Sequence, residues 1–202
     1  MKPLLFIDFN GVISYNNFWN SIYSEAHELF PRRKEINDFV FIESKDFVKE
    51  WMVGKHTSEE AHDLLKDKFG IDKEYLFQIF QKDAIDLDVS ALIMGKLKRL
   101  KAKYKLILIT DNMDTFSRFT LPNNPILSEV FDGIFISYNT GKLKKTDSGR
   151  IFKEIAQIFD GGLDKSIFID DSKSNCDLFE TLGGKSICVT GETEVLKELS
   201  NL

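Results

Sequence analysis

The sequence contains few cysteines and prolines, the residues that cross-link or stiffen a chain. Its 202 residues include only 2 cysteines, Cys176 and Cys188, and 4 prolines. Two cysteines without a Cys-x-x-Cys spacing exclude a disulfide framework and a thiolate metal site, so we expect both to be small buried residues. Stability must therefore come from a hydrophobic core, which the 43% hydrophobic content allows.

Long apolar runs are also absent from the sequence. The apolar stretch 1–7 is broken by Asp8, far short of a signal-peptide core or a bilayer-spanning helix. We therefore expect a soluble, cytoplasmic protein with no membrane partner. The net charge of −5 argues against a nucleic-acid partner, and the basic stretch 96–103 has the helical spacing of a solvated helix face. The oligomeric state is not indicated.

Five short apolar runs, rich in β-branched and aromatic residues, predict buried strands. Amphipathic helical patterns lie between the later runs, as in residues 151–159. This alternation predicts an α/β fold with a Rossmann-like parallel sheet. The predicted strands are residues 4–7, 106–109, 134–136, 167–169 and 187–189.

A long interval between the first two predicted strands carries helical patterns and no buried strand. Thr57-Ser58-Glu59-Glu60 has the pattern of a capping box that opens a helix. Gly70 is placed to end that helix, and Asp72 to cap the next one. We therefore expect an inserted α-helical domain at residues 15–89 and a core domain at residues 1–14 and 90–202.

Polar clusters follow the predicted strands, at the sheet edge where open parallel sheets bind ligands. They are Asp8-Phe9-Asn10-Gly11, Thr110-Asp111-Asn112, Asp170-Asp171-Ser172 and the basic loop Lys142-Leu143-Lys144-Lys145-Thr146-Asp147. Each cluster alone is compatible with a turn, a helix cap or a solvated loop. Their order and position together predict carboxylates that converge on a cation, for which oxygen ligands favour Mg²⁺.

These four clusters resemble, in the same order, the motifs of the haloacid-dehalogenase-like (HAD) hydrolase superfamily. Asp8-Phe9-Asn10-Gly11-Val12 resembles the first motif, Asp-x-Asp-Gly-Thr/Val, and Thr110 resembles the Ser/Thr of the second. The stretch 131–137 is similar to the approach to the third-motif lysine, and Asp170-Asp171 to the fourth motif. The position of the inserted helices resembles the helical (C1) type of cap, which supplies substrate selectivity.

The resemblance implies a Mg²⁺-dependent phosphohydrolase that acts on a small phosphorylated metabolite. Asp8 would attack phosphorus, form an aspartyl-phosphate and ligate Mg²⁺ through its other oxygen. Asp171 and the main-chain carbonyl of Asn10 would be further metal ligands. Asp170 would bind the metal through water or orient the other ligands.

The resemblance also implies groups that bind the phosphoryl oxygens. Thr110 would donate a hydrogen bond to one of them, and Asp111 and Asn112 are candidates for substrate contacts beside it. A lysine of the basic loop would neutralise the transferring charge. Counting back from the following helix favours Lys145, our first choice, whereas counting from the glycine before the loop favours Lys144.

Asn10 departs from the family pattern, because phosphatases of this type usually carry a second aspartate there as general acid and base. An asparagine cannot exchange a proton, and such catalysis is typically worth about 10²–10⁴-fold in rate. The first interpretation is therefore a slowed phosphatase, for which a good leaving group remains compatible. The alternatives are a phosphomutase-like phosphotransferase and a non-catalytic phosphate- or protein-binding module. The substrate itself is not indicated, although Asn16, Asn17, Lys55 and His56 are candidate cap contacts.

Overall fold

The computed structural model describes residues 2–202 and is centred on a five-stranded, all-parallel sheet in the order β3-β2-β1-β4-β5. Each predicted run falls on one strand, with Val189 just beyond the last, so the predicted α/β parallel-sheet fold is confirmed. The strands are β1 (Leu4–Ile7), β2 (Lys105–Thr110), β3 (Gly133–Ile136), β4 (Ile167–Asp170) and β5 (Lys185–Cys188).

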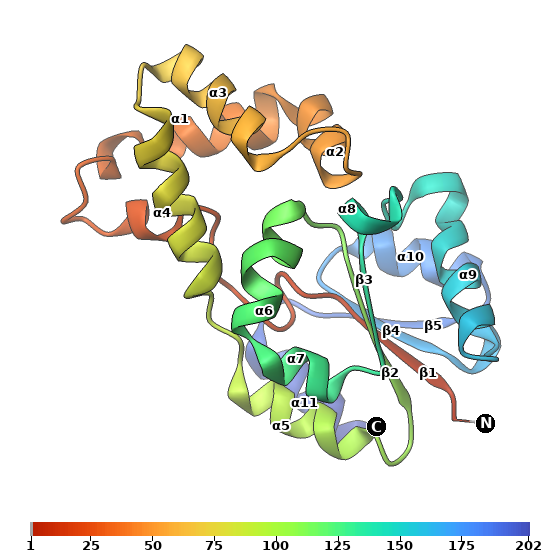
Figure 1. Cartoon of the computed structure of the whole chain (residues 1–202). Helices are drawn as coiled ribbons and strands as arrows, with labels where there is room; N and C mark the ends of the chain where they lie inside the picture. Colours follow the sequence, from red (N-terminus) through yellow and green to blue (C-terminus); the bar gives the residue numbers. More distant parts are fainter. Residues whose placement is uncertain (1) are drawn as a thin grey trace.

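Strand β1 lies at the centre because both of its faces are apolar. Leu5 and Ile7 pack into one hydrophobic cluster, and Leu4 and Phe6 pack into another on the opposite face, as the two-residue period of a strand requires. Figure 1 shows the helices arranged on both faces of the sheet. The first cluster includes residues of α5 (Ala91–Leu100), α7 (Pro125–Val130) and α11 (Glu192–Asn201), and the second includes residues of α9 (Arg150–Ile158) and α10 (Lys173–Thr181).

The chain between β1 and α5 forms helices that lie beyond the carboxyl ends of the strands (Figure 1), and we call this stretch the helical segment. These helices have a hydrophobic cluster of their own, around Trp19, Trp51 and Phe80, to which the rest of the chain adds Met113. The helical elements are η1 (Asn20–Tyr23), η2 (Phe30–Arg32), α1 (Arg33–Asp38), η3 (Phe39–Glu43), α2 (Lys45–Met52), α3 (Ser58–Phe69) and α4 (Lys73–Ile85).

The predicted helix ends in this segment are confirmed. Thr57 and Glu60 form a complete capping box at the start of α3, and Gly70 ends the helix in the left-handed conformation at φ 65°. The carboxylate of Asp72 accepts a hydrogen bond from the Tyr75 N–H, which caps α4.

Short elements complete the connections of the sheet. Cys176 on α10 is buried as expected, but Cys188 is partly exposed because it lies on the edge strand β5. Across residues 2–202, no helix combines the length and the apolar character needed to cross a bilayer. The short elements are η4 (Phe116–Thr120), α6 (Leu121–Asn123), α8 (Ser137–Thr140), η5 (Thr146–Gly149) and η6 (Leu163–Lys165).

Asp114, which follows β2 and is buried, ties the helical segment to the sheet. Its carboxylate accepts hydrogen bonds from Trp51 Nε1 at 2.8 Å and from Ser58 Oγ at 2.5 Å, both on the helical segment. Arg118 donates to the same carboxylate at 2.6 Å and pairs with Glu59 of α3 at 2.7 Å. Hydrogen bonds to a buried charge are among the stronger ones, so this network holds α2 and α3 close to the end of β2.

His62 is fully buried inside the helical segment and is held as the neutral ring. Its Nε2 accepts a hydrogen bond from Trp19 Nε1 at 3.1 Å, and its Nδ1 donates to the Ser58 carbonyl at 2.7 Å. Burial lowers the pKa of His62 from 6.5 to about 4. Protonation of this ring would remove the acceptor that Trp19 uses.

We expect His62 to make the folded state less stable as the pH falls from about 6.5 toward about 4, because the unfolded chain binds a proton there that the folded chain resists. Between pH 7.5 and pH 5 the loss should be about 2 kcal/mol. The check is the urea-derived unfolding free energy at both pH values for wild type, His62→Gln and the half-exposed control His56→Gln. The account is wrong if all three proteins show the same pH dependence.

Candidate active site

The ends of β1, β2 and β4 bring the predicted acidic residues together. Asp8 follows β1, Asp111 follows β2, and Asp170 and Asp171 lie at the end of β4. Because β1 lies between β2 and β4 in the sheet, these side chains meet at its carboxyl edge. One oxygen from each of Asp8, Asp170 and Asp171 lies within 4.8 Å of the others.

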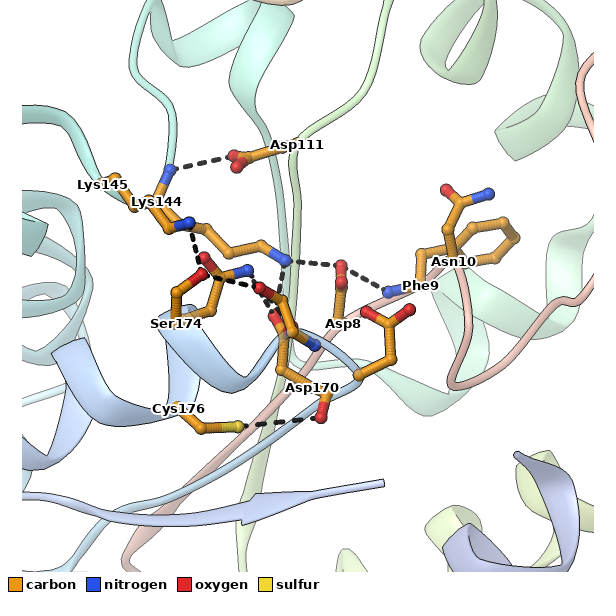
Figure 2. Close-up of polar contacts among 12 residues, drawn as sticks. Asp8, Phe9, Asn10, Asp111, Lys144, Lys145, Asp170, Ser174 and Cys176 are labelled. Carbon is orange, nitrogen blue, oxygen red and sulfur yellow. Dashed lines mark hydrogen bonds and ion pairs between the residues drawn. The ribbon is translucent and has the colours of Figure 1, made fainter. Parts of the chain in front are cut away.

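Lys144 is the cation at the centre of this cluster (Figure 2). Its Nζ lies 2.7 Å from Asp8 Oδ1 and 2.8 Å from Asp170 Oδ2, and the side chain is 2% exposed. Burial by itself would lower the pKa of Lys144, but the carboxylates of Asp8, Asp170 and Asp111 outweigh it and hold this pKa above its usual range. Lys144 is therefore a fixed positive charge.

Lys145, our first choice from the sequence, does not reach the carboxylates. Its Nζ donates to Ser174 Oγ at 2.6 Å on the exposed side of α10, so Lys144 occupies the position that we expected Lys145 to take. Counting back from the helix that follows the basic loop selected the wrong lysine, because Asp147, Ser148 and Gly149 all have positive φ, at 48°, 54° and 79°. This left-handed stretch breaks the regular spacing between the lysines and α9.

Asp170 holds Lys144 in place. Its Oδ1 accepts from the Ser172 N–H at 2.7 Å, and Asn175 Nδ2 lies 3.1 Å from both carboxylate oxygens. Protein donors therefore engage both oxygens of this fully buried group. Asn175 was not singled out from the sequence, although its place in the first turn after the fourth polar cluster is a usable signal.

Asp111 and Asp8 are each fixed by a main-chain N–H. Asp111 accepts from the Lys144 N–H at 2.9 Å, which anchors the basic loop to the end of β2. Asp8 Oδ1 accepts from the Phe9 N–H at 2.7 Å. Burial raises the pKa of Asp8 to about 7, with Asp170 adding to the rise and Lys144 opposing it. Thr110 is buried at the end of β2, the strand next to β1.

The acidic side chains fit a hard divalent cation. Four carboxylates, those of Asp8, Asp111, Asp170 and Asp171, surround the single ammonium of Lys144, and burial raises the pKa of Asp111 and of Asp171. Gly11 makes room for one of them, because a Cβ at this position would lie 2.3 Å from Asp171 Oδ2. Asp8 and Asp171 are therefore placed to share a cation beside the first-motif loop.

Asn10 and Asn112 form a side-chain pair on the other side of Asp8. Asn112 Nδ2 donates to Asn10 Oδ1 at 3.0 Å, and Asn112 Oδ1 accepts from the Met113 N–H at 3.0 Å. Figure 2 shows Asn10 across Asp8 from Lys144, with its amide directed away from Asp170. Asn112 therefore orients Asn10.

A hollow lies between this asparagine pair and the helical segment. Asn10 and Asn112 line it on the sheet side, and Phe18, Trp19 and Phe80 line it on the helical side. The hollow measures about 360 Å³ including its opening to solvent, but only about 20 Å³ admits the centre of a water molecule. In this arrangement it has room for about one water.

The candidate cap contacts that the sequence suggested do not all lie at the hollow. Asn17 lines the hollow, whereas Asn16 is not among its lining residues and its Oδ1 accepts a hydrogen bond from the Asp88 N–H at 3.0 Å. Lys55 and His56 instead lie near Glu50 at the surface, at 2.9 Å and 3.4 Å from its carboxylate oxygens.

Replacing Lys144 by methionine should leave Asp8 and Asp170 buried without a counter-charge. We expect the unfolding free energy at pH 7.5 without added metal to fall by about 3–5 kcal/mol. The matched control is Lys145→Met, which removes an exposed contact and should change stability by no more than about 0.5 kcal/mol. Urea denaturation of the three proteins checks this, and equal losses in both variants would contradict the assignment of Lys144.

Comparison with known proteins finds similarity in structure alone. No protein-family model and no curated protein matches the sequence. Among solved structures, a HAD-family enzyme from Bacteroides thetaiotaomicron, in complex with magnesium and inorganic phosphate, is 21% identical with a TM-score of 0.71. The similarity covers 95% of this chain and 96% of that one.

Two further structures show the same architecture. A predicted HAD-like hydrolase from Porphyromonas gingivalis is 19% identical, has a TM-score of 0.73, and is matched over 100% of this chain and 97% of its own. An L-2-haloacid dehalogenase is 15% identical with a TM-score of 0.68, over 96% of this chain and 87% of that one. With its parallel sheet and near-complete coverage by these structures, the chain has the haloacid-dehalogenase-like fold.

Proposed function

We propose that this protein is a Mg²⁺-dependent phosphohydrolase that releases phosphate from a small phosphorylated metabolite through an aspartyl-phosphate on Asp8. The observation that carries the proposal is the Asp8 carboxylate held 2.7 Å from the buried ammonium of Lys144, with Asp171 beside it. The similar enzyme from Bacteroides thetaiotaomicron, which binds magnesium and inorganic phosphate, supports it.

Asp8, Asp171 and the main-chain carbonyl of Asn10 would hold the Mg²⁺ ion. Bound there, the ion supplies positive charge to the phosphoryl oxygens. Asp170 is left to orient Lys144, because Ser172, Asn175 and Lys144 already engage its oxygens. We assign the metal to Asp8 and Asp171 because their carboxylates keep free lone pairs, whereas both oxygens of Asp170 are already engaged.

The residues of the chain then have distinct roles in the transfer. Asp8, whose Oδ1 is fixed by Lys144 and the Phe9 N–H, attacks phosphorus in line with the leaving group. Lys144 stabilises the charge that develops on the phosphoryl oxygens, and the Thr110 hydroxyl donates to one of them. The buried position of these groups strengthens each interaction relative to water.

The helical segment, residues 15–89, acts as a cap over the site. Asp114, bonded to Trp51 and Ser58, holds it near the end of β2 and limits the access of water. Asn10 takes no part in proton transfer, so both the departure of a basic leaving group and the attack of water are slowed by about 10²–10⁴-fold.

Two related activities fit the geometry less well. The similarity to an L-2-haloacid dehalogenase concerns the fold, and dehalogenation gives no use to the metal-facing Asp171 for which Gly11 makes room. A phosphomutase needs a second phosphate bound by the cap, yet the residues that line the hollow include no lysine, arginine or histidine.

The proposal predicts Mg²⁺-dependent release of phosphate from p-nitrophenyl phosphate. Asp8→Asn should lower kcat/KM at least about a thousandfold, because the nucleophile is lost. Lys145→Met, which alters the neighbouring lysine, should retain near wild-type activity. The measurement is phosphate release with Mg²⁺ and with EDTA, and an Asp8→Asn variant as active as wild type would refute the mechanism.

A further inference from the structure

The orientation of the Asn10 amide is fixed by a chain of hydrogen bonds that begins at a main-chain donor. The Met113 N–H can only donate, so the atom of Asn112 that receives it, at 3.0 Å, must be the oxygen. Asn112 Nδ2 is then the atom that points at Asn10, at 3.0 Å, and Asn10 must present its own oxygen. The Asn10 Nδ2 group is left as a donor with no hydrogen-bond acceptor among residues 2–202, and Asn10 is one of the residues that line the hollow.

A donor that cannot give up its proton suits one class of leaving group. At neutral pH a carboxylic acid, with a pKa of about 4, leaves as a stable anion, whereas a phenol has a pKa of about 10 and an alcohol a higher one. A phenolate or an alkoxide therefore needs a general acid, and a carboxylate does not. The fixed N–H of Asn10 can stabilise the negative charge that grows on a departing carboxylate oxygen.

The residues that line the hollow limit the charge and the size of the leaving group. Phe18, Trp19, Phe80 and Phe116 supply aromatic faces, and Asp83, the one charged residue in the lining, is engaged by the main-chain N–H and the hydroxyl of Ser21. No lining residue is cationic, so a leaving group with a second anionic substituent would have no partner. The enclosed space is small, so the leaving group must be small and the cap must move to admit a ring.

We propose that the substrate is the acyl phosphate of a small carboxylic acid with an uncharged body, whose departing carboxylate accepts a hydrogen bond from Asn10 Nδ2. Asn112 is the positioning residue that turns this donor toward the hollow. The inference rests on the proposed phosphohydrolase function and identifies its substrate class.

Both chemical steps then expel a carboxylate. Asp8 forms a bond to phosphorus while the bond from phosphorus to the acyl oxygen breaks, and the electron pair leaves with the carboxylate, which takes no proton. Water then attacks phosphorus, the bond to Asp8 breaks, and the aspartate carboxylate returns. The dianionic acyl phosphate and one water yield one carboxylate and one H₂PO₄⁻, so both protons of the water remain on phosphate. A general acid is needed in neither step, and Asn10 withholds only the assistance that a base would give to water.

The test compares benzoyl phosphate with benzyl phosphate, which differ only in a carbonyl in place of a methylene, and acetyl phosphate with ethyl phosphate as the smaller pair. We expect Asn10→Asp to raise kcat/KM for the two alkyl phosphates by about 10²–10⁴-fold, because it restores a general acid. The same variant should not raise kcat/KM for the two acyl phosphates, because a departing carboxylate needs no proton and the N–H donor of Asn10 is lost. Asn112 Nδ2 can donate to an aspartate at position 10 as well, so the variant should fold. A rise in kcat/KM on the acyl phosphates as large as that on the alkyl phosphates would overturn the inference.

Asn112→Asp tests the orientation with Asn10 intact. An aspartate there still accepts from the Met113 N–H but can only accept from Asn10, so the Asn10 amide should turn and face the hollow with its oxygen. The added charge weakens the binding of every phosphate alike, so the readout is the ratio of acyl to alkyl phosphate kcat/KM. We expect this ratio to fall at least about tenfold, as the loss of one charge-stabilising donor implies, and an unchanged ratio would contradict the role of Asn112.

The outcomes separate this inference from the proposed function. If no substrate is cleaved in a manner that requires Asp8, the phosphohydrolase function fails. If all are cleaved through Asp8 and Asn10→Asp raises both classes alike, the function stands and the acyl phosphate assignment fails.

Discussion

The Lys144 ammonium, buried between Asp8 and Asp170, is the interaction on which the site depends. Two carboxylates at this depth would repel each other, and the ammonium between them offsets this repulsion and part of the cost of burying them. The sheet order makes the contact possible, because β1 and β4 are neighbours and deliver the two aspartates side by side. Hydrogen bonds from Asn175 and from the Ser172 N–H then hold Asp170 in place. The Asp111 carboxylate accepts a hydrogen bond from the Lys144 N–H and so holds the loop that carries the lysine.

The asparagine at position 10 changes the proton chemistry of the site but leaves its local hydrogen bonding intact. Its oxygen is satisfied by Asn112, which an aspartate at this position would also be, so the local structure is compatible with either residue. What differs is the second atom of the side chain, an N–H donor in place of a group with an exchangeable proton. The asparagine at this position of the motif that the sequence resembles therefore bears on the leaving group of the proposed reaction.

The sequence predicted the sheet well because parallel strands buried on both faces read as short continuous apolar runs, as in Leu4–Ile7 and Ile167–Asp170. The strand-end acids followed from the same rule. The choice between Lys144 and Lys145 could not be made, because it depends on left-handed residues at Asp147 and Ser148 that propensity does not foresee. Contacts between residues far apart in the sequence could not be predicted either, because no local pattern encodes them. Examples are the Asn10–Asn112 pair and the hydrogen bonds of Asp114 to the helical segment.

The most direct test of this account is the chemical state of Asp8 during turnover. Protein mixed with acetyl phosphate and Mg²⁺ would be quenched in acid, digested, and examined by mass spectrometry for a phosphorylated peptide containing residues 3–9. The account predicts acid-stable phosphate on Asp8, absent without Mg²⁺ and absent from Lys144→Met. Release of phosphate with no phosphorylation of Asp8 at any quench time would contradict it.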